Sequence, residues 1–145
     1  MEKENPLVSI ITPCYNGENV MHRLLDSILS QTYSNIEFIL INDGSTDHSE
    51  EIWYQYEKKF NEKGIKTIYI HQRNQGLGAA INAGLKVFTG DYLCWPDIDD
   101  YFEDTSVEKR VNFLETHKEY GSVSSDANQY MEDNLSEPVG KWQAG

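Results

Sequence analysis

The sequence predicts an α/β domain with a mainly parallel sheet and helices on both of its faces. Short apolar runs rich in β-branched residues alternate along the chain with segments whose apolar residues recur every three or four positions. Polar residues and glycine follow most of the apolar runs, as is typical where a strand ends in a loop. A chain of 145 residues is long enough to bury a core, so residues 1–145 are predicted to form a single domain.

The first helix is expected between the first two strands. Residues 7–12 (LVSIIT) predict a buried strand that ends before Pro13, because proline lacks the backbone N–H that a sheet ladder needs. Apolar residues at helical spacing over 18–31 predict an amphipathic helix. Residues 36–42 (IEFILIN) predict the second strand.

A second helix is expected after the turn at residues 43–47, which contains a glycine and several N-cap candidates. Gly64 is expected to end that helix. Residues 66–70 then predict the third strand, and an apolar stripe over 76–88 predicts the third helix, with Gly90 close behind it.

The fourth predicted strand, residues 92–95, leads directly into the acidic run 97–100 (DIDD). Apolar residues over 107–114 mark another helix, and 121–124 predict the start of a fifth strand. From about residue 128 the pattern gives way to polar residues, and we expect the chain to be a fragment of a longer protein.

The charge of the chain restricts the class of partner. The formal net charge is −12 and the sequence pI is about 4.6. Binding to a nucleic-acid backbone needs clustered lysine and arginine, so no nucleic-acid partner is expected, whereas a nucleotide bridged by a metal ion is allowed.

Three features predict a cytoplasmic protein. No apolar stretch approaches the roughly 20 residues that would cross a bilayer. The first residues lack the apolar region of a signal peptide. Cys14 and Cys94 lie far apart, without metal-ligand spacing, and are predicted to be buried free thiols in a reducing compartment.

The residues with chemical potential follow the predicted strands. In an open parallel sheet, ligands bind beyond the carboxyl ends of the strands where the strand order reverses. With the order 3-2-1-4, the first and fourth strands are neighbours, and the crevice between them is the predicted site. The candidates at these ends are Pro13, Tyr15, Asn16, Asp43, Arg73, Asn74, Gly76, Asp97 and Asp99.

The acidic run predicts metal-assisted phosphate chemistry. Asp97 and Asp99 would offer hard oxygen ligands to Mg²⁺ or Mn²⁺, which in turn hold substrate phosphates. Tyr15 could stack on a base, and Asp43 could accept hydrogen bonds from a base imide or a ribose hydroxyl. Arg73 could pair with a pyrophosphate.

Each of these assignments has a structural alternative. Tyr15 could equally be a core or surface tyrosine, Asp43 a helix cap and Arg73 a surface residue. Gly76 and Gly78 match only part of a dinucleotide fingerprint, since the third glycine is missing, and tight helix packing explains them as well.

Several motifs together resemble the family-2 glycosyltransferases of the GT-A fold. The resemblance covers residues 7–125, and the matching blocks occur in order and at similar spacing. They are 8–16 (VSIITPCYN), 27–32 (SILSQT), 37–47 (EFILINDGSTD), 74–76 (NQG), 82–84 (NAG), 89–92 (TGDY) and 97–100 (DIDD).

This resemblance implies a Rossmann-like three-layer domain that binds a nucleotide-diphosphate sugar, with a UDP- or dTDP-sugar as the leading donor. It places Pro13 and Tyr15 in the base pocket and has Asp43 read the base. Asp97 and Asp99 would form the DxD motif, with Asp97 toward the ribose and Asp99 on Mn²⁺ or Mg²⁺.

The resemblance also implies transfer to a saccharide or glycolipid acceptor with inversion at the anomeric carbon. The general base of such enzymes lies well past the DxD motif, and we expect it beyond Gly145. The 145-residue chain is therefore expected to bind donor and metal but to transfer sugar poorly. A glycolipid acceptor would place the longer parent at the cytoplasmic face of the membrane.

Two departures from the family pattern and three alternatives remain. Ile81 stands where many relatives have an arginine, and Pro96 directly before the DxD motif is unusual. A phosphatase-like enzyme would use Asp97 as nucleophile and Asp99 as general acid. A sugar nucleotidyltransferase, or a module that binds nucleotide sugars without catalysis, would share the ligand class.

Overall fold

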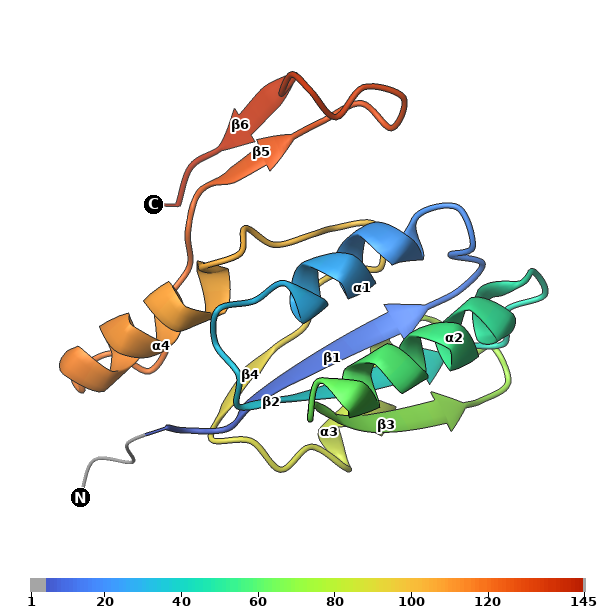
Figure 1. Cartoon of the computed structure of the whole chain (residues 1–145), viewed down its shortest axis with the longest axis horizontal. Coiled ribbons are helices and arrows are strands. Elements are labelled where there is room, and N and C mark those ends of the chain that lie inside the picture. The colour runs from blue at the N-terminus through green and yellow to red at the C-terminus, as the bar shows by residue number, and fades with distance from the viewer. Residues whose placement is uncertain (1–4, 145) are drawn as a thin grey trace. The chain divides into compact units, whose positions relative to one another are not determined.

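The structure, a computed structural model, describes residues 5–144 (Figure 1). The chain divides into two compact units, residues 1–111 and 112–145. The single domain expected for residues 1–145 stays a prediction. The main sheet and the predicted site both belong to the first unit.

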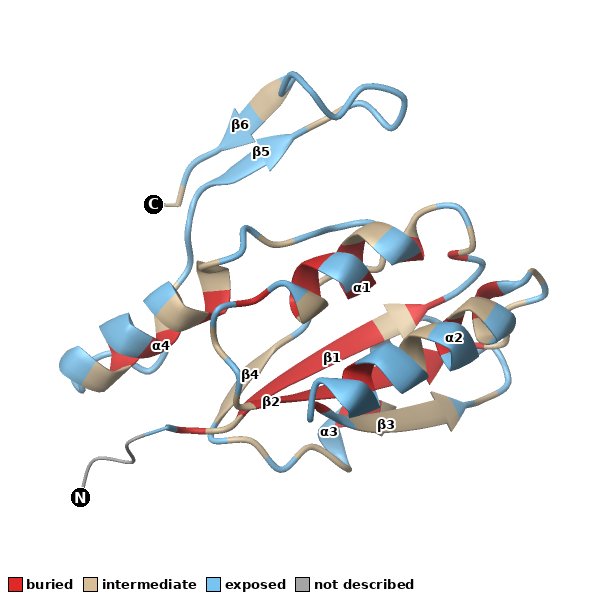
Figure 2. Ribbon diagram, viewed as in Figure 1, coloured by how far each residue is buried: buried red, intermediate tan, exposed pale blue. Residues whose placement is uncertain are grey.

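A four-stranded parallel sheet forms the centre of the first unit. Its order is β3-β2-β1-β4, as the sequence predicted. The strands are β1 (Val8–Cys14), β2 (Ile36–Asn42), β3 (Lys66–His71) and β4 (Tyr92–Cys94). The two central strands β1 and β2 are almost wholly buried, which explains their continuous apolar sequences (Figure 2).

Helices cover both faces of this sheet. They are α1 (Met21–Leu29), α2 (Ser49–Glu62), α3 (Leu77–Leu85) and α4 (Ser106–Thr116). Buried residues of α1, α2 and the first turns of α4 share one apolar cluster with one face of the sheet. Ala80 of α3 packs in a second cluster on the opposite face. The unit thus has the three layers expected of the predicted fold.

Aromatic rings fill the core between α2 and the sheet. Phe38 of β2 stacks on Phe60 with ring centroids 5.2 Å apart, and it lies 5.6 Å from the ring of Trp53. All three side chains are fully buried. Their burial contributes several kcal/mol, at roughly 25 cal/mol per Å² of apolar surface, and fixes α2 against the sheet.

A buried carboxylate joins three strands to the loop before β4. Glu37 accepts hydrogen bonds from Ser9 Oγ at 2.6 Å and from Thr89 N and Oγ1 at 2.5 and 2.8 Å. Lys66 Nζ lies 3.1 Å from Glu37 Oε2. Burial alone would raise the pKa of Glu37, but these donors lower it to about 2.

Strand β1 extends further than the sequence predicted. It continues through Pro13, which pairs with Ile41 of β2. Pairing with β4 ends at Ile10, so Pro13 lies where β1 has only one neighbouring strand. A missing N–H is tolerated at such a position.

The predicted fifth strand at residues 121–124 is wrong, because no strand forms there. The second unit instead contains an antiparallel pair, β5 (Ala127–Gln129) and β6 (Gly140–Trp142). Most residues of both strands are exposed, so this hairpin has no apolar alternation that could have revealed it.

Two expectations about apolar helices and cysteines can be compared with the described residues. Within 5–144, no helix is both long enough and apolar enough to cross a membrane. Cys14 and Cys94 are free thiols; Cys14 is buried, as predicted, whereas Cys94 is only partly buried.

Candidate functional site

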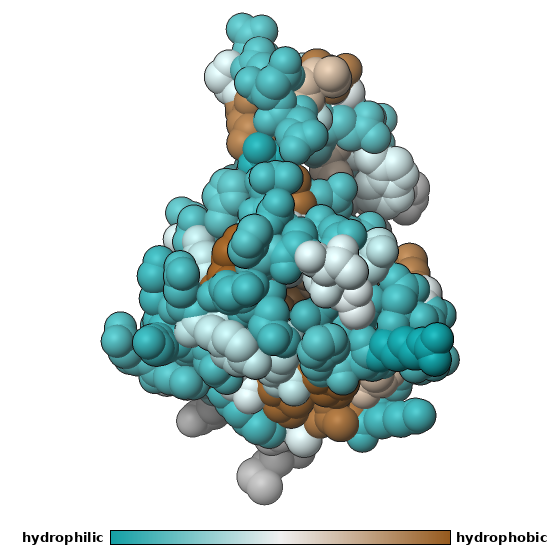
Figure 3. All heavy atoms as spheres, turned by 90° about the vertical axis from the view of Figure 1, so that its right-hand side faces the viewer, coloured by the Kyte–Doolittle hydropathy of each residue, from teal (hydrophilic) through white to brown (hydrophobic). Residues whose placement is uncertain are grey.

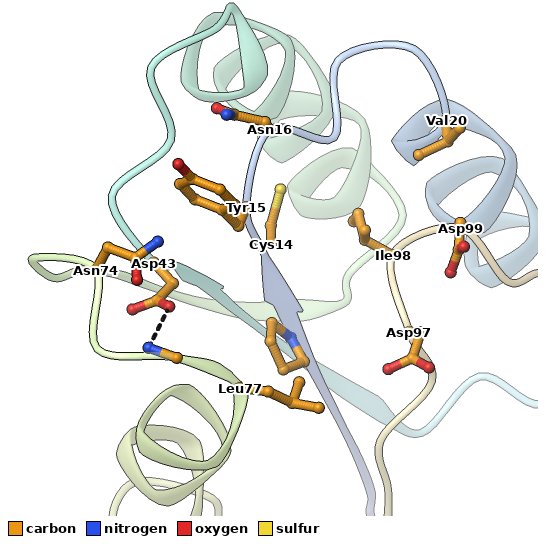
Figure 4. Close-up of a pocket in the computed structure, with 12 residues that line it drawn as sticks. Cys14, Tyr15, Asn16, Val20, Asp43, Asn74, Leu77, Asp97, Ile98 and Asp99 are labelled. Carbon is orange, nitrogen blue, oxygen red and sulfur yellow. Dashed lines mark hydrogen bonds between the residues drawn. The ribbon is translucent and has the colours of Figure 1, made fainter.

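An open pocket of about 480 Å³ lies at the carboxyl ends of the strands. Figure 3 looks toward this end of the molecule, where hydrophilic residues dominate and apolar residues form only small groups. The close-up in Figure 4 shows the lining side chains. They are Pro13, Cys14, Tyr15, Asn16, Val20, Asp43, Asn74, Gly76, Leu77, Asp97, Ile98 and Asp99.

The structure brings together every candidate site residue except Arg73. Arg73 is exposed on the loop after β3 and does not line the pocket, although its neighbour Asn74 does. The geometry therefore gives no support to the predicted pyrophosphate contact of Arg73. The structure shows that the other candidates line one pocket. Their individual roles stay predictions.

The loop after β1 presents Tyr15 and Asn16. Tyr15 is 53% exposed, which leaves much of its ring open to a ligand. Asn16 has φ of 52°, a left-handed conformation that asparagine tolerates better than most residues. Its Oδ1 accepts a hydrogen bond from Thr46 N at 2.8 Å, and its N–H donates to Ser45 Oγ at 3.0 Å. Asn16 thus ties its loop to the loop after β2.

Three further contacts join these two loops. Gly17 N donates to Ser49 Oγ at 2.9 Å, and Glu18 N donates to Asp47 Oδ2 at 3.0 Å. The ring of His48 lies 2.8 Å from Glu18 Oε2. Hydrogen bonds from His48 lower the pKa of Glu18, and the same pairing raises the pKa of His48. The loop that carries Tyr15 and Asn16 is therefore tied to the segment between β2 and the start of α2.

Asp43 is buried at the end of β2, with only 4% of its surface exposed. Its Oδ1 accepts from Gln72 Nε2 at 2.8 Å and from Gln75 N at 3.0 Å, and its Oδ2 accepts from Gly76 N at 2.9 Å. Figure 4 marks one hydrogen bond of this carboxylate. Burial alone would raise the pKa of Asp43, but the three donors lower it, so the group is ionised at neutral pH.

The contacts of Asp43 differ from those of a cap on α2. Its hydrogen-bond donors belong to the segment between β3 and α3, and Gly76, the residue before α3, has φ of 88°. A side chain would be strained at this left-handed position. Asp43 therefore shapes the loop that forms one wall of the pocket.

The acidic side of the pocket comes from the loop after β4. Asp97 and Asp99 are exposed, and Figure 4 shows them across the pocket from Asp43 and Tyr15. Asp97 N donates to Asp100 Oδ2 at 3.3 Å. Burial raises the pKa of Asp100, and the charges of Asp99 and Asp97 raise it further.

The donor set fits a metal ion that is bound together with a phosphate ligand. Nowhere in residues 5–144 do three histidine, cysteine, aspartate or glutamate side chains converge on one point, so no all-protein metal cage is present there. Magnesium-type ions are commonly held by one or two carboxylates, with substrate phosphates and water as the remaining ligands. Asp97 and Asp99 offer such an incomplete set.

Four lining residues were not predicted, namely Cys14, Val20, Leu77 and Ile98. All are apolar or weakly polar and resemble core residues in the sequence. Leu77 is the first residue of α3 and is 58% exposed, although its place on the apolar stripe of the predicted helix marked it as a core residue. Ile98 contacts the loop after β1 so closely that a Cβ on Gly17 would lie 3.0 Å from its Cγ1.

Comparison with known proteins gives the family. A family model described as glycosyl transferase family 2 matches residues 9–141. The chain belongs to glycosyl transferase family 2. This family-2 chain is 44% identical over 110 residues to an uncharacterized glycosyltransferase of Rickettsia prowazekii, a match that covers 76% of the chain and 32% of the relative. It is 46% identical over 101 residues to glycosyltransferase GlyA of Streptococcus pneumoniae, covering 70% of the chain and 14% of the relative.

The family-2 chain therefore spans a third or less of the length of these relatives. Among solved structures it resembles S. aureus TarS 1–349 in complex with UDP, at 26% identity and a TM-score of 0.69, covering 77% of the chain and 33% of TarS. It also shares its fold with the mannosyltransferase PcManGT of Pyrobaculum calidifontis in complex with GDP-Man and Mn²⁺, at 21% identity and a TM-score of 0.69, covering 78% of the chain and 33% of that protein. The predicted GT-A architecture is confirmed.

Proposed function

We propose that this chain is the donor-binding portion of a glycosyltransferase that uses a nucleotide-diphosphate sugar. The observation that carries the proposal is the arrangement of the pocket, with Tyr15 and Asp43 on one side and Asp97 and Asp99 on the other. A flat, partly apolar base fits the first side, and a diphosphate held through a cation fits the second.

A UDP- or dTDP-sugar is the proposed donor. Pro13 and Tyr15 offer apolar surface to the faces of the base, and the ionised Asp43 accepts its imide N–H. The likeness to TarS, at 27% identity in a structure with UDP-GlcNAc, supports uridine. Asn74 and Gly76 line the same side and would contact the base or ribose.

Asp97 and Asp99 are the proposed holders of a divalent cation, Mn²⁺ or Mg²⁺. Asp97 would lie toward the ribose and Asp99 on the ion, with oxygens of the diphosphate completing the ligand set. When bound, the cation supplies positive charge that stabilises the departing nucleoside diphosphate. Asp97 and Asp99 would hold the cation, and with it this positive charge, at the edge of the sheet.

The chain spans a third or less of the relatives named above, and the rest of the reaction is proposed for a protein of their length. Family resemblance supports transfer with inversion to a saccharide or glycolipid acceptor, with the general base supplied by residues outside this chain. The same resemblance supports peripheral membrane association of the parent. The chain itself is proposed to supply donor and metal binding.

Calorimetric titration with UDP, with and without Mn²⁺, tests the proposal. Binding should depend on Mn²⁺ and should weaken at least about tenfold in Asp99→Asn, since a charged ligand to the cation is lost. Asp104→Asn removes the same charge from an exposed position on the same loop that does not line the pocket, and it should bind as the unaltered chain does. Absence of UDP binding at millimolar concentration by a folded chain would contradict the proposal.

A further inference from the structure

Gln72 is a half-buried residue directly after β3 whose two hydrogen bonds both reach the end of β2. Its N–H donates to Asn42 O at 2.9 Å, which continues the strand pairing by one residue. Its side-chain Nε2 donates to Asp43 Oδ1 at 2.8 Å. The opposite orientation of the amide would place an oxygen against a carboxylate, so the hydrogen bond fixes the orientation.

The hydrogen bonds to Asp43 leave one acceptor position. An ionised carboxylate has about four such positions, two on each oxygen. Gln72 Nε2 and Gln75 N occupy both positions on Oδ1, and Gly76 N occupies one on Oδ2. The remaining position on Oδ2 is the one through which a ligand in the pocket can be bound.

The nucleobases differ in the donors that they offer to such a group. Uracil and thymine offer a single imide N–H between two carbonyl oxygens. Guanine offers two adjacent donors, which pair best with both oxygens of a carboxylate at once. Cytosine and adenine place a ring nitrogen lone pair beside their amino group, and this lone pair is repelled by a carboxylate. One free position on one oxygen therefore suits the imide.

We infer that Gln72 is a positioning residue that sets base selectivity, because its amide holds Oδ1 of Asp43 and leaves only Oδ2 to accept from a base. This inference rests on the proposed nucleotide-sugar site and adds a residue that determines which base the site prefers. Gln72 does not line the pocket and acts on the ligand only through Asp43. The chain accordingly selects uridine or thymidine diphosphates over guanosine diphosphate.

The test compares UDP and GDP affinity in the unaltered chain and in Gln72→Met. Methionine keeps the length of the side chain and removes the donor, so Oδ1 is held by one hydrogen bond fewer and the carboxylate can turn more freely to present both oxygens to a base. The ratio of the GDP to the UDP dissociation constant should fall by about tenfold or more, as for loss of one hydrogen bond to a charged group. General damage to the site would weaken both nucleotides alike and leave the ratio unchanged.

Two further variants complete the experiment. Gln72→Asn retains the amide on a side chain that is one methylene too short to reach Asp43. It should also lower the ratio of the GDP to the UDP dissociation constant, and it replaces Gln72→Met in the test if that variant does not fold. Gln55→Met makes the same substitution at an exposed position of α2 and should keep the original ratio. Circular dichroism establishes folding for each.

The outcomes separate the two proposals. A chain that binds UDP in preference to GDP, with the same ratio in folded Gln72 variants, overturns the role of Gln72 and leaves the donor site standing. A chain that prefers GDP from the outset also overturns it. Failure of the unaltered chain to bind any nucleoside diphosphate overturns the proposed function and this inference with it.

Discussion

Tyr15 and Asp43 line one pocket but differ in how the protein holds them. Asp43 is buried and fixed by three donors of the chain, whereas Tyr15 is 53% exposed. No aromatic ring among residues 5–144 stacks on Tyr15. The carboxylate of Asp43 is therefore held in place before a ligand binds. The exposed ring of Tyr15 can gain contacts when the ligand binds.

Substitution of Tyr15 should change binding without changing stability. Tyr15→Ala is expected to weaken UDP binding by about 10- to 100-fold, since stacking of a base on an aromatic ring contributes about 1–3 kcal/mol. Tyr15→Phe keeps the ring and should retain the affinity. Calorimetry measures both, and thermal unfolding should show similar midpoints for all three chains. Equal weakening by both substitutions would show that the hydroxyl, and not the ring, is what matters.

At this scale the sequence identified the polar residues of the site, with the exception of Arg73, and missed most of the apolar ones. Arg73 was predicted to pair with a pyrophosphate but does not line the pocket, and the preceding residue, Gln72, donates a hydrogen bond to Asp43. Residues 72–76 lie in an irregular loop after β3, and sequence alone does not specify which of its side chains faces the site. The aspartates were predictable because several of them follow one strand.

Close approach of α3 to the sheet depends on a glycine. A Cβ on Gly84 would lie 2.4 Å from Ile11 Cγ2 and 3.1 Å from Ile41 Cδ1. Ile11 is branched at Cβ and fully buried, so it cannot move aside cheaply. Gly78 lies in the same helix but is exposed, and a Cβ added there would meet no atom within 4 Å.

Two alanine substitutions in α3 should therefore have opposite effects. Gly84→Ala should lower the free energy of unfolding by about 1–3 kcal/mol, as expected for overpacking of a core. Gly78→Ala should raise it by about 0.5–1 kcal/mol, because alanine is the better helix former. Chemical denaturation measures both. A stabilising Gly84→Ala would mean that α3 does not lie against Ile11 as described.

The Glu37 network gives an element-scale prediction of acid stability. The pKa of Glu37 in the folded chain is about 2, against an ordinary value of 4.5. A lowered folded pKa contributes stability above the unfolded value, and this contribution is lost as pH falls from about 4.5 toward 2. The loss should amount to about 3 kcal/mol.

Denaturation between pH 6 and pH 2 measures this contribution. Glu37→Gln should destabilise the chain by about 3 kcal/mol at neutral pH, because a carbonyl and an amide cannot accept from all the donors around them. The variant should also lose less stability on acidification than the unaltered chain. Parallel pH profiles for the two chains would show that Glu37 is not the group responsible.

Prediction of the elements succeeded where burial on both faces left a continuous apolar run. Strand β2 was predicted at its observed bounds, because all of its residues are buried and the pattern has clear ends. Prediction from the sequence failed for β5 and β6. Their pairing depends on backbone hydrogen bonds, such as that from Val139 N to Gln129 O at 2.7 Å. Backbone pairing between exposed polar residues leaves little trace in a sequence.

At the scale of the whole molecule, the pocket uses residues of one unit only. All of its lining residues belong to the unit of residues 1–111, and they come from the end of β1, the start of α3 and the segments that follow the four parallel strands. The formal net charge of −12 disfavours an anionic ligand that binds without a cation. Donor binding is therefore expected to be a property of this unit together with a divalent ion.

Nuclear magnetic resonance of the ¹⁵N-labelled chain, titrated with UDP and Mg²⁺, tests this central claim most directly. Amide shifts should change at Tyr15, Gly76 and Ile98, which line the pocket, and should stay constant at Gly64 and Gly90, which do not. Replacing Mg²⁺ by Mn²⁺ should broaden signals most strongly near Asp99. Shifts that spare the pocket residues, or no shifts at millimolar UDP, would contradict the account.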